Sequence, residues 1–170
     1  MIQLIKFYWG LCTLKTAPQD LPASTALLGL TVLAYFVTSI TVAVLQWQVP
    51  KAVLASLLDT LLLAVLSYVI LWSRLLSGRY YQTLSALAGS GAILGVISLP
   101  LIVWQKLIGL PTDGTITLPS ILLFLWTGWN VAVVGHILRH ALSTAYALGV
   151  GLAAVYTYIT VRLIQIFFHD

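Results

Sequence analysis

The chain has 170 residues, of which 61% are hydrophobic and only 7% are charged, and its formal net charge is +4. Soluble domains carry about 25% charged residues, so this chain has too few charges to solvate a globular surface. The composition therefore excludes a soluble globular protein and predicts an all-α, polytopic membrane protein. The Lys and Arg residues stand singly, without the basic cluster that binds nucleic acid, so we expect the bilayer and its anionic headgroups as partners and no nucleic acid.

The first 15 residues, MIQLIKFYWGLCTLK, differ from the rest of the chain. On a helix they place a narrow polar stripe opposite an apolar face that holds Ile5, Trp9 and Cys12. We expect residues 1–15 to form a short amphipathic helix that lies flat at the membrane interface and is retained. Cys12 is the single cysteine, so it can form no internal disulfide, and we expect it to act as a small hydrophobe.

Residues 16–170 contain the membrane domain. A membrane-spanning helix needs about 20 apolar residues. Five runs satisfy this requirement, over residues 22–45, 52–72, 82–104, 119–138 and 141–168. Pro100 predicts a kink in the third helix, and the GLPTDGT segment at 109–115 predicts a tight turn after it. The sequence thus predicts five transmembrane helices behind one interfacial helix.

Basic residues in the short connections predict the orientation of the chain, because they favour the cytoplasmic side. An inner-membrane protein with a cytoplasmic N-terminus and a periplasmic C-terminus places five on the cytoplasmic side and three outside. The cytoplasmic group is Lys6, Lys15, Arg74, Arg79 and Arg139, and the outer group is Lys51, Lys106 and Arg162.

Asp59 and Arg162 fall within predicted membrane spans, where ionisable side chains are costly and mark functional candidates. Both lie in the outer half of the bilayer, so one interpretation is an ion pair that joins the second and fifth spans. In a second, Arg162 reaches the headgroups and Asp59 bonds to a neighbouring serine or threonine. A proton or ion relay is the third, with Ser56 and Asn130 as the other polar contributors.

The HILRH segment (136–140) places two imidazoles one helical turn apart. A zinc site needs three or four ligands, yet no cysteine lies nearby and His169 belongs to the opposite membrane face. Two histidines on one helix cannot clamp opposite faces of a haem. We expect neither metal nor cofactor, and predict that the segment ends the fourth span at the headgroups. The predicted headgroup anchors are Lys6, Arg74, Arg79, His136, Arg139 and His140.

Small residues at a spacing of four predict close helix packing. They are Gly91 with Gly95 in the third span, Gly128 with Ala132 in the fourth, and Ala147 with Gly151 in the fifth. No nucleophile elbow, phosphate-binding loop or pair of carboxylates is present, so we expect no enzymatic activity.

Two stretches, SGRYYQTLSALAGSGAILGVISLPL (77–101) and LWTGWNVAVVGHILRHALSTAYALGVGLAAV (125–155), resemble the bacterial branch of the Yip1 family of small polytopic membrane proteins. The resemblance covers most of the chain from Lys15 onward. The five closely spaced helices and the short cytoplasmic N-terminal segment expected above are part of the same resemblance, which implies a small polytopic protein without established enzymatic activity. No functional residue of the family can be matched individually.

These features favour a non-catalytic scaffold or accessory subunit that packs against another inner-membrane protein, or against a second copy of the chain. A transporter or channel-like protein with a polar route around Asp59 is the alternative. An enzyme that acts on lipid is a third possibility, which the lack of a paired nucleophile and base disfavours.

Overall fold

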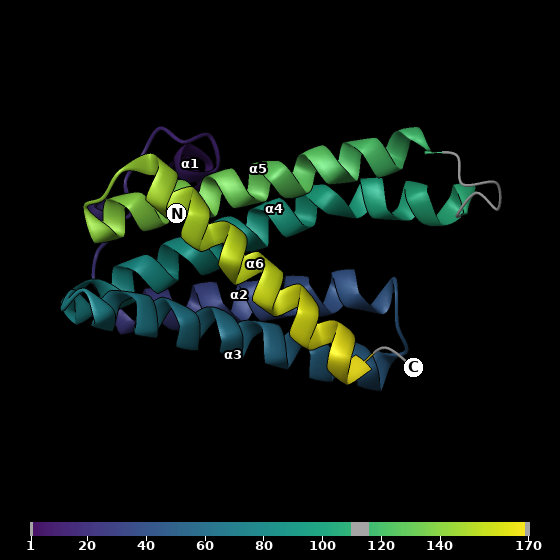
Figure 1. Cartoon of the computed structure of the whole chain (residues 1–170), viewed down its shortest axis with the longest axis horizontal. Coiled ribbons are helices and arrows are strands. Elements are labelled where there is room, and N and C mark those ends of the chain that lie inside the picture. Colours follow the sequence, from purple (N-terminus) through teal and green to yellow (C-terminus); the bar gives the residue numbers. More distant parts are fainter. Residues whose placement is uncertain (1, 110–115, 169–170) are drawn as a thin grey trace.

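The computed structural model describes residues 2–109 and 116–168, which form an all-α fold without strands. Six α-helices are connected by short loops and two 3-10 turns (Figure 1). The α-helices are α1 (Ile2–Cys12), α2 (Thr25–Val44), α3 (Val49–Ser73), α4 (Tyr80–Ile108), α5 (Leu118–Leu142) and α6 (Tyr146–Phe168), and the 3-10 turns are η1 (Pro18–Asp20) and η2 (Ser77–Arg79). The predicted fold class is confirmed. Residues 110–115 of the predicted turn, and His169, lie outside the described residues.

Helices α2 to α6 are each long and apolar enough to cross a membrane. A helix of 20 residues, the length of α2, spans about 30 Å, which matches the hydrocarbon core of a bilayer. Large apolar side chains such as Leu30, Leu125 and Phe124 are exposed on the outside of these helices. This surface suits lipid rather than water, as expected for a multi-pass membrane protein.

The boundary between the last two spans differs from the prediction. Helix α5 continues to Leu142 and α6 begins at Tyr146, whereas the sequence placed the break between 138 and 141. Ser143 ends α5 in the left-handed conformation (φ 53°), and the backbone N–H of Thr144 donates to the carbonyl of Arg139 at 2.9 Å. Glycine usually marks such a helix end. Because serine occupies this position, no residue in the sequence marked the end of this helix.

Helix α4 forms the centre of the bundle. Every residue from Thr83 to Ser90 is buried, and most of these residues are small, which allows neighbouring helices to approach from several sides. Helix α2 packs on α4, α5 packs on both α4 and α6, and α3 packs on α2. Toward the end of the bundle that holds the end of α6, the α4–α5 pair diverges from the α2–α3 pair, and α6 lies across both (Figure 1).

Helix α1 docks against α4 and is not merely an interfacial helix. Tyr8, Leu11 and Cys12 are buried, and the Cys12 thiol donates to the Ser90 carbonyl at 3.8 Å. Burial raises the pKa of Tyr8 to about 12 and that of Cys12 to about 11. The residues of the apolar face predicted from the sequence therefore do not all have the same environment. Cys12 faces the bundle, whereas Ile5 and Trp9 are exposed.

Candidate functional site

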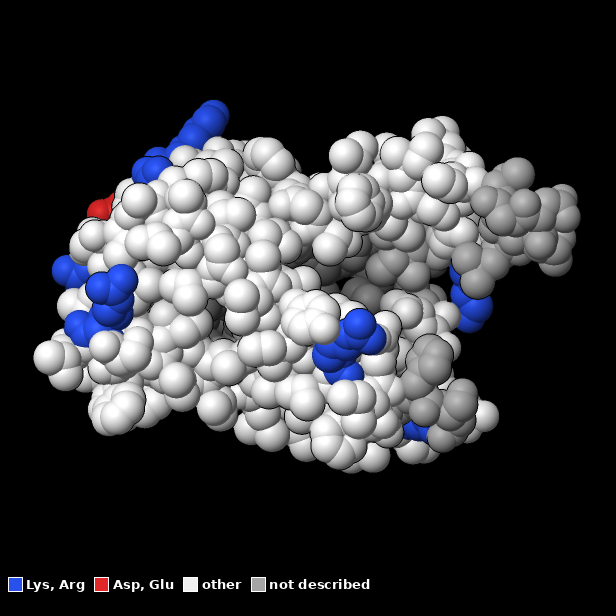
Figure 2. Space-filling view, in the orientation of Figure 1, with Lys and Arg blue, Asp and Glu red and all other residues white. Residues whose placement is uncertain are grey.

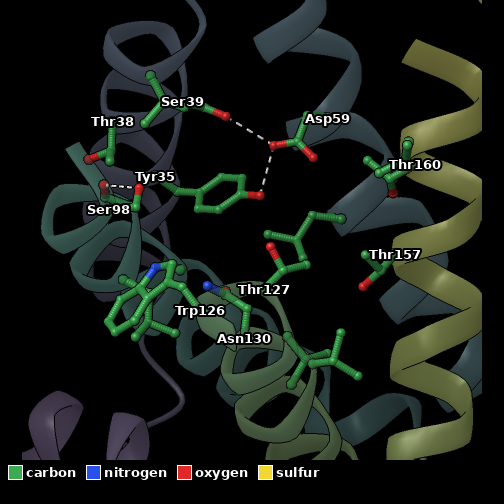
Figure 3. A pocket seen from close by; sticks show the side chains of 18 of the residues that line it. Tyr35, Thr38, Ser39, Asp59, Ser98, Trp126, Thr127, Asn130, Thr157 and Thr160 are labelled. Atoms are coloured by element: carbon green, nitrogen blue, oxygen red, sulfur yellow. Dashed lines mark hydrogen bonds between the residues drawn. The ribbon is translucent and has the colours of Figure 1, made fainter. Parts of the chain in front are cut away.

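A cavity of about 430 Å³ lies inside the membrane domain, and helices α2 to α6 all contribute to its walls. Its volume falls within the range of roughly 300–1,000 Å³ that is common for small-molecule sites. The space-filling surface is hollowed between α5 and α6, where this cavity lies (Figure 2). Most of the lining is apolar, and its polar side chains are Tyr35, Thr38, Ser39, Asp59, Ser98, Thr127, Asn130, Tyr156, Thr157 and Thr160, together with the indole of Trp126 (Figure 3).

Asp59 is held on the cavity wall by two hydroxyl groups of α2. Tyr35 Oη donates to Asp59 Oδ2 at 2.7 Å, and Ser39 Oγ donates to the same oxygen at 3.0 Å (Figure 3). The two donors stand four residues apart, so they lie on one face of α2. Within the described residues, Asp59 Oδ1 accepts no hydrogen bond. The carboxyl group is thus fixed through one oxygen, and no described residue donates to the other.

The predicted ion pair between Asp59 and Arg162 is not formed. The Arg162 side chain is exposed, and its Nε donates to Tyr158 Oη at 3.3 Å. Its guanidinium carbon lies 5.4 Å from the centre of the same ring. Tyr158 stands one turn earlier on α6, so the arginine is held along its own helix and away from Asp59. The second interpretation, in which Asp59 bonds to a nearby hydroxyl, agrees with the structure.

The other two polar candidates, Asn130 and Ser56, differ in their position relative to the cavity. Asn130 is half-buried on α5 and lines the cavity together with Asp59. Ser56 is buried on α3, its Oγ has no hydrogen-bond partner, and it does not line the cavity. The sequence reasoning missed Tyr35 and Ser39. Their signal was two hydroxyls at i and i+4 in the middle of an apolar helix, a pattern that can supply two hydrogen-bond donors to one buried carboxyl group.

The HILRH segment has an internal structural role that the sequence did not reveal. His136 is buried, with its Nε2 3.0 Å from the carbonyl oxygen of Thr16, in the loop after α1. Its predicted role as a headgroup anchor is therefore wrong, because the ring is enclosed by the chain. The His140 ring packs edge-to-face on His136 at 4.7 Å, and the His140 carbonyl accepts from Gln19 Nε2 at 2.7 Å. Within the described ranges, no three His, Cys, Asp or Glu residues could hold a metal ion.

The remaining predicted anchors differ in their surroundings. Arg79 Nη1 donates to the Ala141 carbonyl at 3.1 Å and to Ser143 Oγ at 3.0 Å, so it joins η2 to the end of α5. Arg139 is half-buried, 5.6 Å from the Tyr146 ring centre. Lys6 and Arg74 are exposed. Several basic side chains gather at the end of the bundle that holds the α5–α6 turn (Figure 2).

Of the predicted small-residue pairs, one lies at a close contact between helices and the other two do not. A Cβ atom at Gly91 would lie 2.7 Å from the Tyr35 ring, and one at Gly95 would lie 2.6 Å from Thr38 Cγ2. These two glycines therefore allow α2 to pack closely against α4. Gly128 and Gly151 face outward, where an added Cβ would meet nothing within 4 Å. Of their predicted partners, Ala132 is half-buried and Ala147 is exposed.

Two glycines outside the predicted pairs form the contact between α5 and α6. A Cβ at Gly135 would lie 2.8 Å from Val150 Cα, and one at Gly149 would overlap the carbonyl oxygen of Gly135. The two backbones therefore touch directly at these positions. Only residues without a side chain allow so close an approach.

Comparison with protein-family models, with curated proteins and with solved structures finds no match to this chain.

Proposed function

We propose that this chain is a multi-pass membrane protein that binds a small solute in the cavity beside Asp59 and moves it through the membrane. The observation that carries the proposal is a carboxyl group on the wall of an intramembrane cavity, held by Tyr35 and Ser39, with no basic side chain of the described residues in the cavity wall. Ionisable groups in membrane spans are expensive and mark substrate or ion pathways. A carboxyl group in a membrane span could instead serve only to join two helices through an ion pair. Arg162, however, contacts Tyr158 and not Asp59.

The hollow in the space-filling surface beside the cavity supports access from outside the bundle (Figure 2), and the arrangement of the helices indicates the end from which it comes. The α2–α3 and α4–α5 pairs diverge toward the end that holds the last residues of α6 (Figure 1). With a cytoplasmic N-terminus in a bacterial inner membrane, this end faces the periplasm. We therefore propose that the described conformation is open outward, and that transport requires a second conformation open to the cytoplasm.

Cysteine accessibility tests this proposal. The variant Asn130→Cys, in a Cys12→Ser background, places a thiol in the cavity, and Gly128→Cys places one on the outward face only two residues away, about 3 Å along the helix axis. Thiols react as thiolates, which need water. A small water-soluble methanethiosulfonate should therefore label the cavity thiol in membrane vesicles and leave the lipid-facing thiol unlabelled.

The side of labelling separates transport from simple binding. A transporter should expose Asn130→Cys to an impermeant reagent in both right-side-out and inside-out vesicles. Labelling from one side alone would contradict transport and leave a binding cavity. No labelling from either side, with normal labelling after unfolding, would contradict the whole proposal.

A scaffold or accessory subunit is the second candidate. It is supported by the outward face that holds Gly128 on α5 and Gly151 on α6, where a further transmembrane helix could approach closely. Gentle detergent extraction should then recover the chain with a stoichiometric membrane-protein companion, and Gly128→Leu should release that companion without unfolding the chain. Recovery of the chain alone, in mild detergent and at native abundance, would count against this function.

A further inference from the structure

We propose that the solute is an organic monovalent cation with apolar substituents, and that Asp59 supplies its counter-charge. This inference deepens the proposed function and rests on the cavity being a solute site. Four features of the described residues support it: the charge of the lining, its aromatic walls, its single carboxylate, and polar atoms that lack partners.

The charge of the lining favours a cation. Asp59 is the one ionisable acidic residue that contributes to the cavity wall, and no Lys, Arg or His of the described chain joins it there. The neighbouring cation on α6, Arg162, is exposed and lies over the Tyr158 ring. Charges interact strongly where protein and lipid replace water. A cation in the cavity would therefore be attracted, and an anion would meet a carboxylate without compensation.

The walls favour an organic rather than an inorganic ion. Tyr35, Trp126 and Tyr156 present aromatic side chains to the cavity, and aromatic faces attract alkylammonium groups. The other apolar side chains of the lining are aliphatic. A divalent metal ion instead requires about six or more oxygen ligands, usually with several carboxylates. With one carboxylate available, the cavity suits a larger ion of low charge density.

Unpartnered polar atoms indicate where an occupant could bind. Thr160 is 8% exposed and lines the cavity beside Tyr156, and among the described residues its Oγ1 makes no hydrogen bond of regular geometry. In Figure 3, Thr160 lies on α6, with Asp59 between it and Tyr35. Buried polar groups are nearly always satisfied, and a cation that lies against Asp59 Oδ1 and Thr160 Oγ1 would interact favourably with both oxygens.

The charge preference can be measured at Asn130→Cys in the Cys12→Ser background. Three methanethiosulfonate reagents serve as probes: the ethyltrimethylammonium, the ethylsulfonate and the uncharged methyl compound. Each labelling rate is divided by the rate of the same reagent with free 2-mercaptoethanol. We expect the normalised cation-to-anion ratio to exceed one by at least about tenfold, because a carboxylate nearby attracts one reagent and repels the other. Asp59→Asn should bring the ratio close to one, and Asp59→Glu should keep it high.

Protection by an unreactive cation tests occupancy directly. Tetraethylammonium chloride should slow labelling by the uncharged reagent, whereas sodium chloride at the same ionic strength should not. The protection should disappear in Asp59→Asn and persist in Asp59→Glu. An unchanged rate with the uncharged reagent shows that the cavity survives in each variant. If Asp59→Asn does not fold, the ratio and the protection with Asp59 in place decide the question.

The outcomes distinguish this inference from the function on which it rests. If no reagent reaches Asn130→Cys, the solute cavity itself is refuted. If all three reagents react with a normalised ratio near one, or if tetraethylammonium gives no protection, the cavity stands and the cation inference is overturned. A high ratio that Asp59→Asn leaves unchanged would overturn the role of Asp59 as the counter-charge.

Discussion

The contact between α5 and α6 predicts opposite effects for two glycine substitutions on the same helix. In Gly135→Ala, the new methyl group would lie 2.8 Å from Val150 Cα and 2.9 Å from its backbone N. These are main-chain atoms, so no side-chain rotation can relieve the overlap, and the two helices must move apart. In Gly128→Ala the methyl group would meet nothing within 4 Å.

The expected magnitudes follow from two effects. Replacing glycine by alanine within a helix stabilises it by roughly 0.5–1 kcal/mol, and this gain applies to both variants. Overpacking costs about 1–3 kcal/mol and applies only to Gly135→Ala. The free energy of unfolding should therefore be lower for Gly135→Ala than for Gly128→Ala by about 1–3 kcal/mol. Gly128→Ala itself should be at least as stable as the parent.

Reversible unfolding in mixed micelles, with increasing sodium dodecyl sulfate and a helix signal by circular dichroism, measures this difference. On α6, Gly149→Ala and Gly151→Ala form a second matched pair, because a Cβ at Gly149 would overlap Gly135 and one at Gly151 would meet nothing. Equal stabilities within both pairs would refute the inference that α5 and α6 touch through their backbones at Gly135 and Gly149.

Four further predictions concern the cavity and the docked N-terminal helix. Tyr35→Phe removes a donor from Asp59 and should lower the free energy of unfolding by about 1.5–3 kcal/mol in the same assay, whereas no change would contradict the bond. Because no ion pair joins Arg162 to Asp59, Arg162→Ala should change the free energy of unfolding by less than about 0.5 kcal/mol. Its effect should also add to that of Asp59→Asn in a double-mutant cycle, and a coupling energy above about 0.5 kcal/mol would show that the two side chains do interact. His136→Ala removes the contact with the Thr16 carbonyl and should speed limited proteolysis of the loop after α1 more than His140→Ala does, and equal rates would show that His136 does not hold this loop. Since burial raises the pKa of Cys12 from 9.0 to about 11, its thiol should resist iodoacetamide at pH 8 until the chain unfolds, and rapid alkylation of the folded protein would contradict its burial. The contribution of the neutral thiol to the free energy of unfolding should be complete below pH 9 and be lost as the pH rises through about 11.

The sequence alone was sufficient for the number and approximate limits of the apolar helices. A bilayer provides no hydrogen-bond partners, so a long apolar run can satisfy its backbone only as a helix. The run lengths therefore predicted α2 to α6, and the polar stripe near the N-terminus predicted α1. The end of α5 was misplaced because Ser143 takes the left-handed position there, and serine carries no signal for such a turn.

Which faces of the helices meet was decided by the tertiary structure. In a soluble helix the apolar stripe marks the core, but lipid is as apolar as the interior of this bundle, so both faces carry similar residues. The sequence therefore identified Asp59 as costly yet could not choose Tyr35 and Ser39 over Arg162 as its neighbours. For the same reason it could not tell that Gly135 and Gly149 join two helices while Gly128 and Gly151 face outward, since the rotation of each helix about its axis is set only by packing against the others.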